Sequence, residues 1–114
     1  MFMYLYVELW KARSAWLELP REQRKSWFDN LLSSLQQQMS AGVEPLGFAR
    51  SDQDTPLDAG YDFIGAWRMP NKETAEQFEK FVENAGWHEY FEQVNARGQI
   101  MEMDEFSSAH LEMN

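Results

Sequence analysis

The sequence contains no cysteine, which excludes disulfide bonds, thiolate nucleophiles and cysteine-ligated zinc or iron–sulfur sites. It has only two histidines, His88 and His110, so a dedicated zinc or non-haem iron site is not expected. Basic residues form no cluster, because ten Lys and Arg stand against nineteen Asp and Glu, for a net charge of −9. Phosphate backbones and anionic lipids repel such a chain, so the composition predicts neither nucleic-acid nor membrane binding.

Long apolar runs are missing as well. No segment approaches the length of roughly 20 apolar residues that a transmembrane helix needs. The apolar start of the chain has no basic region before it, unlike a signal peptide. We therefore expect a cytoplasmic protein. Phosphate-cradling glycine loops and the short motifs of serine hydrolases and zinc proteases are also absent.

Three aspartates between residues 51 and 60 suggest calcium, but their spacing does not fit an EF-hand-like loop. Such a loop needs Gly at its sixth position and Glu at its twelfth. Counted from Asp52, those positions hold Leu57 and Phe63. We expect a solvated hairpin loop here and no metal site.

Aromatic residues are abundant instead. Eight Phe, five Trp and four Tyr make up 15% of the 114 residues. A chain of this length forms a single domain, here residues 1–114, and its core is too small to enclose every ring. Some aromatic side chains are therefore expected to line a pocket or a subunit interface.

The order of sequence patterns predicts the fold. Alternating apolar residues indicate strands, and apolar residues spaced three or four apart indicate helices. Together they give a β-α-β-β-α-β series, the ferredoxin-like α+β fold, with both helices on one face of a four-stranded antiparallel sheet. Residues 106–114 form a C-terminal tail. The expected strands are 2–10, 46–50, 61–69 and 100–104.

Each helix has start and stop signals. Pro20 suits the first turn of the first helix, and Gly42 suits its end. Asn71 is a good cap for the second helix. Gly86 interrupts the second helix, which is therefore expected to bend or break there and to resume at Trp87 before Gly98 ends it. The first helix has an apolar stripe of Phe28, Leu31, Leu32, Leu35 and Met39.

The first strand has apolar or aromatic side chains on both faces. Its odd positions are aliphatic, and its even positions include Tyr6, Glu8 and Trp10. Helices cover only one face, and the other would expose more apolar surface than monomers usually do. Two such faces joined about a twofold axis form a dimeric α/β barrel, so a homodimer is predicted. In the alternative, the tail of a monomer covers the face.

The segment Phe63-Ile64-Gly65-Ala66-Trp67 and the helix after it resemble the dimeric α/β-barrel superfamily. That superfamily includes antibiotic-biosynthesis-type monooxygenases, muconolactone isomerases, chlorite dismutases and small haem-degrading enzymes. Further segments resemble an uncharacterised small bacterial family of the same architecture, to which no activity is assigned. These segments are Tyr6–Trp10, Ala15–Leu17 and Trp87–Gly98.

The resemblance to the monooxygenases implies that Trp67 faces a pocket between sheet and helices. By alternation Phe63 and Gly65 share its face, and Gly65 either admits a neighbouring element or leaves room for a ligand. The monooxygenase pattern has a polar Asn where this chain has Phe63, and this difference argues against the monooxygenase mechanism in this chain. In the alternative, Trp67 is ordinary core.

Two further residues are candidates for acid–base chemistry. His88 lies at the edge of the stripe that begins at Trp87, a position suited to a general base or to an axial haem ligand. Glu8 lies between Tyr6 and Trp10 on one strand face, and burial there would raise its pKa. In the alternative, Glu8 pairs with Arg50 or Arg68.

The sequence thus leaves two functions open. In the first, the protein is a cofactor-independent enzyme of oxygenase or isomerase type that acts on an apolar or aromatic molecule. His88, Glu8 and Tyr6 are its candidate catalytic residues, with haem binding through His88 as a variant. In the second, it is a non-catalytic ligand-binding or interaction dimer. The candidate substrate-binding residues are Trp67, Phe63, Trp10 and Trp87.

Overall fold

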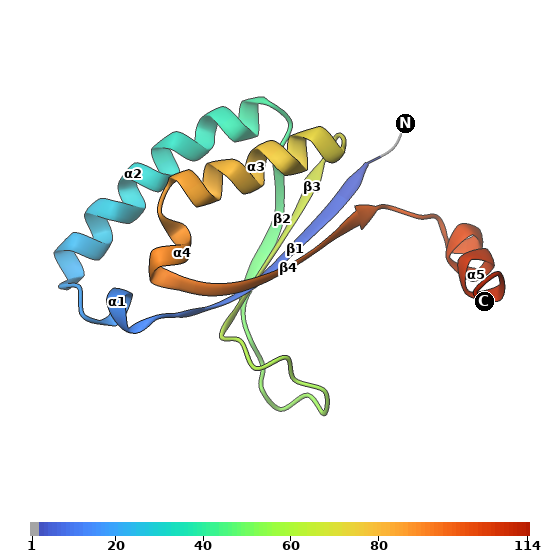
Figure 1. Cartoon of the computed structure of the whole chain (residues 1–114), viewed down its shortest axis with the longest axis horizontal. Coiled ribbons are helices and arrows are strands. Elements are labelled where there is room, and N and C mark those ends of the chain that lie inside the picture. The colour runs from blue at the N-terminus through green and yellow to red at the C-terminus, as the bar shows by residue number, and fades with distance from the viewer. Residues whose placement is uncertain (1–2) are drawn as a thin grey trace.

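Strand β1 (Tyr4–Ala12) lies at the centre of a four-stranded antiparallel sheet. A computed structural model describes residues 3–114 and gives the order β2-β3-β1-β4 in that sheet. This is the predicted ferredoxin-like α+β arrangement (Figure 1). The other elements are α1 (Ser14–Leu17), α2 (Arg21–Ser40), β2 (Glu44–Arg50), β3 (Phe63–Met69), α3 (Lys72–Asn84), α4 (Trp87–Tyr90), β4 (Phe91–Gln99) and α5 (Met103–Leu111).

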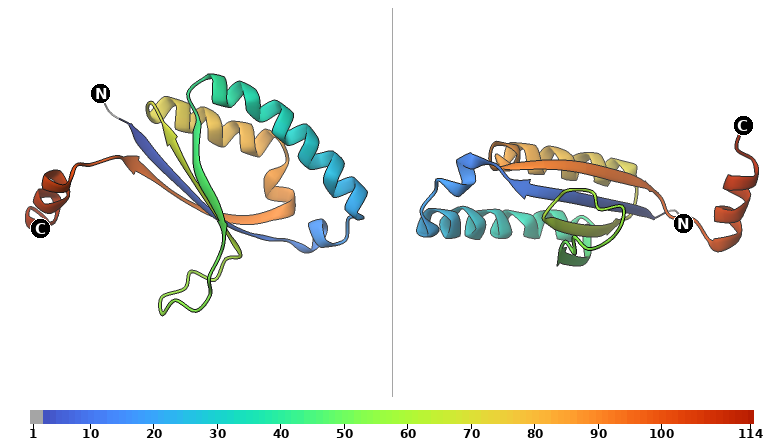
Figure 2. Two further views of the ribbon diagram at one scale, coloured as in Figure 1. Left: turned by 180° about the vertical axis from the view of Figure 1, so that it is seen from behind. Right: turned by 90° about the horizontal axis from the view of Figure 1, so that it is seen from below.

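Helices α2 and α3 lie side by side on one face of the sheet, as Figures 1 and 2 show. The side chains of β1 follow the predicted alternation, since Tyr6 and Glu8 are buried on the helical side while Leu5 is 40% exposed on the other. Across β1, Tyr6 is opposite Trp67 and Glu8 is opposite Gly65, so these side chains share the helical face. The opposite face has no helix over it among residues 3–114.

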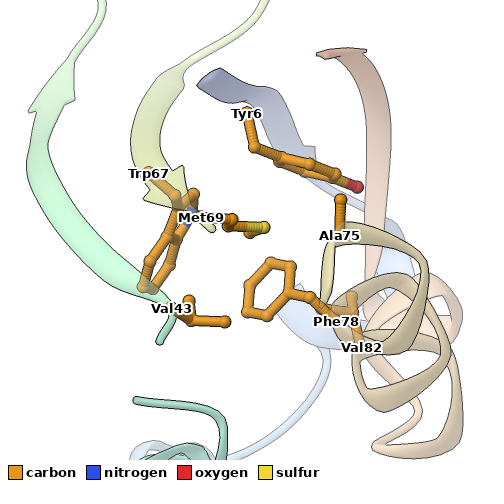
Figure 3. Packing of buried hydrophobic residues seen from close by; sticks show 7 residues of the cluster. All are labelled: Tyr6, Val43, Trp67, Met69, Ala75, Phe78 and Val82. Atoms are coloured by element: carbon orange, nitrogen blue, oxygen red, sulfur yellow. The ribbon is translucent and has the colours of Figure 1, made fainter. Parts of the chain in front are cut away.

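The core is concentrated between α3 and the neighbouring strands. Met69 and Ala75 are completely buried, and Phe78 packs against Trp67 and Tyr6 with ring centroids 5.0 and 5.6 Å apart. Figure 3 shows Phe78 pointing from α3 toward Met69 and Trp67. Asn71 caps α3 as predicted, with its side chain accepting a hydrogen bond from the Thr74 amide.

Helix α2 is attached to the sheet less closely. It begins after Pro20 and ends before Gly42, which has φ of 108°, in agreement with the sequence signals. None of its side chains is fully buried, although its apolar stripe points toward the sheet. The stripe therefore borders a space between α2 and the sheet instead of filling it.

The predicted break at Gly86 is present, but the segment after it differs from the prediction. Gly86 has φ of 83° and separates α3 from the single turn of α4. The chain then becomes strand β4, in place of the expected resumed helix that ends at Gly98. Nine residue pairs join β4 to β1, from Ala12–Phe91 to Tyr4–Gln99. This non-local pairing outweighs the local spacing of Tyr90, Phe91 and Val94, which fits a helix equally well.

The pairing of β4 with β1 also contradicts the strand that was expected after it. The expected strand 100–104 does not form, because β4 already occupies the edge position beside β1. Residues 106–111 of the expected C-terminal tail belong to helix α5, which stands away from the rest of the molecule (Figure 1). Strands β2 and β3 differ from prediction by only two residues at one end, and Phe2 lies outside the described residues.

The left-handed conformation at Gly86 leads to a first prediction. A Cβ atom there meets nothing closer than Glu89 Oε2 at 3.9 Å, so Gly86→Ala has no steric clash. We expect it to lower the free energy of unfolding by about 1–2 kcal/mol, because φ is positive. Urea denaturation measures this. Gly47→Ala is the matched control, since its Cβ also meets nothing within 4 Å and its φ is not positive. Equal stability of both variants would contradict the explanation.

Candidate functional site

A cavity of about 310 Å3 lies between the sheet and helices α2 and α3. This volume is at the lower end of the range of small-molecule sites, roughly 300–1,000 Å3. Among its lining residues only Glu8 is charged. The others are apolar or aromatic: Trp10, Phe28, Leu31, Leu32, Leu35, Phe48, Trp67, Phe78, Phe81, Val82 and Trp87.

The mouth of the cavity lies between α2 and β2. Phe48 on β2 is 61% exposed and Leu32 on α2 is 52% exposed, and these are the most exposed of the lining side chains. Glu8, which also lines the cavity, is only 6% exposed.

Glu8 is held by hydrogen bonds on both of its oxygens. Trp67 Nε1 donates to Oε1 at 2.7 Å, and Gln93 Nε2 donates to Oε2 at 2.9 Å. The strand register explains this geometry. Trp67 and Gln93 lie on the two strands flanking β1, each two residues from the residue opposite Glu8 and therefore on the same face. Each carboxylate oxygen has two acceptor positions, so each keeps one that Trp67 and Gln93 do not use.

Burial raises the pKa of Glu8 above its ordinary value, because removal from water disfavours the charged form. The hydrogen bonds from Trp67 and Gln93 act in the opposite direction and lower it, but burial is the larger effect. No cationic side chain contributes. The predicted alternative of an ion pair with Arg50 or Arg68 is wrong, because Arg68 pairs with Glu44 and Arg50 lies over the ring of Phe63.

Gln93 connects the carboxyl group to a second tryptophan. Its Oε1 accepts from Trp87 Nε1 at 2.7 Å, while its Nε2 donates both to Glu8 and to Asn95 Oδ1 at 2.8 Å. These contacts fix the orientation of the Gln93 amide. If the amide were flipped, its NH2 group would face the N–H group of Trp87, and two donors would meet. Trp67, Glu8, Gln93 and Trp87 thus form one polar chain beneath an apolar cavity.

Gly65 shapes the wall beside Glu8. A Cβ atom at this position would lie 3.1 Å from Trp10 and 3.3 Å from Phe48. The missing side chain therefore lets these two rings approach across β3. Of the two roles considered for Gly65, the structure shows the close approach of neighbouring groups.

Tyr6 shares the face of Glu8 but does not line the cavity. Its hydroxyl donates to Glu79 Oε2 at 3.1 Å, and Arg97 Nε donates to the same oxygen at 3.1 Å. Burial and the adjacent Glu79 raise the pKa of Tyr6 well above its ordinary value, so the phenol stays protonated at neutral pH. This arrangement ties β1 to α3 and leaves the hydroxyl engaged outside the cavity.

Like Tyr6, two further predicted site residues do not line the cavity. His88 is exposed on α4 and does not line the cavity, so its expected place as the polar group of the pocket is wrong. The error follows from the helix that was expected to resume at Trp87. In the structure α4 is a single turn, and His88 is exposed on it. Phe63 does lie on the face of Trp67, but it stacks on Trp10 with centroids 5.8 Å apart and does not reach the cavity. Glu8, Trp67, Trp10 and Trp87 do line it.

Gln93 is a site residue that the sequence patterns do not indicate. They place it on a helix, where nothing would bring it to Glu8. Its role depends on the pairing of β4 with β1, because alternation then places Gln93 on the helical face. No group of three or more potential metal ligands occurs within residues 3–114. No helix in that range is long and apolar enough to cross a bilayer.

The sheet order and the helical layer define a ferredoxin-like α+β domain. The chain belongs to a family of unknown function (DUF6616), whose model matches residues 3–113. No curated protein matches it significantly.

Several solved structures share the fold. A chlorite dismutase variant from Candidatus Nitrospira defluvii superposes with a TM-score of 0.72 and 19% identity over 96% of this chain and 44% of that one. The same enzyme in complex with imidazole superposes with a TM-score of 0.68 and 14% identity, over 88% of this chain and 40% of that one. For a protein described as a putative chlorite dismutase the TM-score is 0.63 and the identity 13%, over 95% of this chain and 48% of that one. This chain spans less than half of each, and at these identities the similarity shows the fold alone.

The hydrogen bond from Trp67 to Glu8 leads to a second prediction. Trp67→Phe keeps the ring packing but removes the donor that lowers the pKa of Glu8. The pKa of Glu8 should therefore rise further, as measured by NMR titration of its carboxyl carbon. Trp16→Phe, on α1, where the ring packs on Tyr90 and Phe91, should leave the titration unchanged. An unchanged pKa in Trp67→Phe would mean that the hydrogen bond does not exist in solution.

The raised pKa of Glu8 also makes stability depend on pH. The folded protein holds this proton more tightly than the unfolded chain, so stability falls as pH rises from about 4.5, the unperturbed value, through the raised pKa. Glu8→Gln lacks this dependence. The difference in unfolding free energy, wild type minus Glu8→Gln, should therefore shift in favour of the wild type from pH 8 to pH 5. A shift of opposite sign would refute the assignment.

Proposed function

We propose that the cavity binds a small apolar or aromatic molecule and that Glu8 exchanges a proton with it, as in a cofactor-independent isomerase or oxygenase. The observation that carries this proposal is a single carboxyl group with raised pKa in a cavity walled by apolar side chains. Buried acids of this kind occur preferentially at sites of proton transfer.

The size and lining of the cavity favour a molecule of one or two rings. Its 310 Å3 is about twice the roughly 150 Å3 of an engineered cavity that holds benzene. Trp10, Trp67 and Trp87 supply flat apolar surface, and aromatic ligands stack favourably on such rings. A charged ligand is disfavoured, because within the described lining only Glu8 is charged.

Ionised Glu8 would take a proton from a carbon next to a carbonyl group and become a neutral carboxyl, which leaves an enolate in the cavity. For an enolate conjugated with a carbon–carbon double bond, return of the proton to the far carbon shifts the double bond and completes an isomerisation. In the oxygenase variant the enolate carbon instead supplies its electrons to dioxygen and bonds to it, and the proton on Glu8 passes to the resulting peroxide anion to give a hydroperoxide. The free acceptor position on each Glu8 oxygen serves the first transfer, while Trp67 and Gln93 hold the group in place.

Haem does not fit the residues of this cavity. A haem iron takes an axial ligand such as His, Cys, Met or Tyr. None of these residue types is among the described side chains that line the cavity, and both histidines are exposed. The proposal therefore assigns no step to haem and gives His88 no part in the chemistry.

One observation favours the second candidate, a non-catalytic ligand-binding protein. The protein itself supplies a donor to each oxygen of Glu8, which is how purely structural carboxylates are satisfied. In that case Glu8 fixes the positions of Trp67 and Gln93, and the cavity binds without reaction.

A homodimer joined through the open sheet faces also remains our proposal. The face without helices contains the odd-numbered side chains of β1 together with their neighbours on β3 and β4. Leu5 and Val94 on it are 40% and 45% exposed, and apolar surface of this extent favours a partner.

Deuterium exchange tests the proton transfer. The probe is 2-tetralone, a bicyclic apolar ketone, incubated with the protein in deuterated buffer and followed by proton NMR. We expect exchange next to the carbonyl to exceed the buffer rate, and Glu8→Gln to lower the protein-dependent rate by about a hundredfold. Binding is measured separately by quenching of tryptophan fluorescence, and Glu83→Gln is the control with an exposed carboxyl.

The outcomes separate the candidates. Binding with exchange that depends on Glu8 supports catalysis by proton transfer. Binding without exchange rejects catalysis on this class of ketone and supports the non-catalytic function. Failure of 2-tetralone and of the neutral hydrocarbon naphthalene to bind overturns the assignment of the cavity as a ligand site.

A further inference from the structure

Helix α5 has apolar side chains with no surface to pack on. Met103 is 80% exposed, Phe106 49% and Leu111 78%, and no residue of the helix is buried. Figures 1 and 2 show α5 standing away from the sheet and from the other helices. A short amphipathic helix is marginal alone in water, since most helical stability comes from packing of its apolar face.

A groove of about 390 Å3 lies where α5 leaves the sheet. Its floor is the open face, with Leu5, Val7 and Ala96, and its far wall is the first turn of α5, with Met103 and Phe106. The helix and the sheet thus form an apolar corner that is open on the remaining side.

The path of the chain keeps α5 from folding back over its own sheet. The Ile100 amide donates to the Met3 carbonyl at 2.8 Å, so the ladder beside β1 continues past the end of β4. Glu102 is extended, with φ of −76° and ψ of 166°, and α5 begins at the next residue. Only Met101 and Glu102 remain to reverse the direction, and the extended Glu102 carries the helix outward.

The area of the open face indicates what occupies the corner. Four strands of seven to nine residues present a face of roughly 30 by 19 Å, or about 570 Å2. An interface of standard size buries about 800 Å2 per partner, so contact between two sheets alone is smaller than a standard interface. A pair of exposed amphipathic helices, one from each copy, supplies the missing area.

We propose that α5 is an arm that packs on the open sheet face of a second copy of this chain, with Phe106 and Leu111 buried on the partner. The inference rests on the proposed homodimer and adds that each chain completes the other's interface. Twofold symmetry makes the exchange reciprocal, so both apolar corners are filled at once. Asp104, Glu105 and Glu112 then stay in solvent.

Sedimentation equilibrium of single variants tests the arm. Phe106→Glu and Leu111→Glu should each raise the dimer dissociation constant at least tenfold, because each introduces a charge into the interface. They should not unfold the domain, since α5 contributes nothing to its core. Leu57→Glu is the control, a residue that is 93% exposed in the loop between β2 and β3. Val7→Glu, on the open face, reports on the contact between the sheets.

The results distinguish the arm from the dimer itself. A wild-type dimer weakened by Val7→Glu and by both arm variants, with Leu57→Glu unchanged, supports the exchange. A dimer weakened by Val7→Glu alone overturns the arm and keeps the sheet interface. A wild-type monomer at 100 μM overturns both, without bearing on ligand binding in the cavity.

Cross-linking tests whether the arm reaches the other copy. The chain has no cysteine, so Ser107→Cys and Ala96→Cys each introduce a unique thiol. Equal amounts of the two variants are mixed and treated with a short bismaleimide. A product that contains one chain of each kind supports exchange between copies. If the mixed product fails to form while the double variant cross-links within single chains, α5 packs on its own sheet and the proposal is wrong.

Discussion

The burial of Glu8 is the constraint on which the rest of the site depends. A carboxyl group that is 6% exposed needs hydrogen-bond donors, and the fold supplies them from the two strands on either side of β1. The requirement explains why Trp67 presents its indole nitrogen to β1 and why Gln93 occupies the inner face of an edge strand. It also explains why a polar residue faces inward on β4, where packing alone would favour an apolar one.

Pattern and periodicity were sufficient for much of the fold. The alternation in β1, the signals at Pro20 and Gly42, and the break at Gly86 all reflect local backbone preferences, and the structure agrees with each. Local signals failed at β4, because the spacing of Tyr90, Phe91 and Val94 suits either a helix or a strand. The choice between them is made by pairing with β1, some eighty residues earlier in the chain.

The same failure determined which site residues were found. Glu8 and Trp67 were identifiable because they lie on strands whose alternation was clear. Gln93 was missed and His88 was misplaced because both assignments depended on the structure of residues 87–99. The apolar stripe of α2 was evident from its spacing, and four of its residues form a wall of the cavity. Whether a stripe packs or borders a cavity depends on the distance between layers, which sequence periodicity does not specify.

The loose attachment of α2 has a consequence for how the domain opens. Without a fully buried side chain, this helix contributes little to the cooperative core around Met69 and Phe78. Segments of this kind open locally at a smaller free-energy cost than global unfolding, and their amides exchange with solvent sooner. Local opening of α2 would widen the mouth between α2 and β2 and so ease access to the cavity. A ligand that fills the cavity would in turn contact the apolar stripe of α2 and stabilise the attachment of this helix.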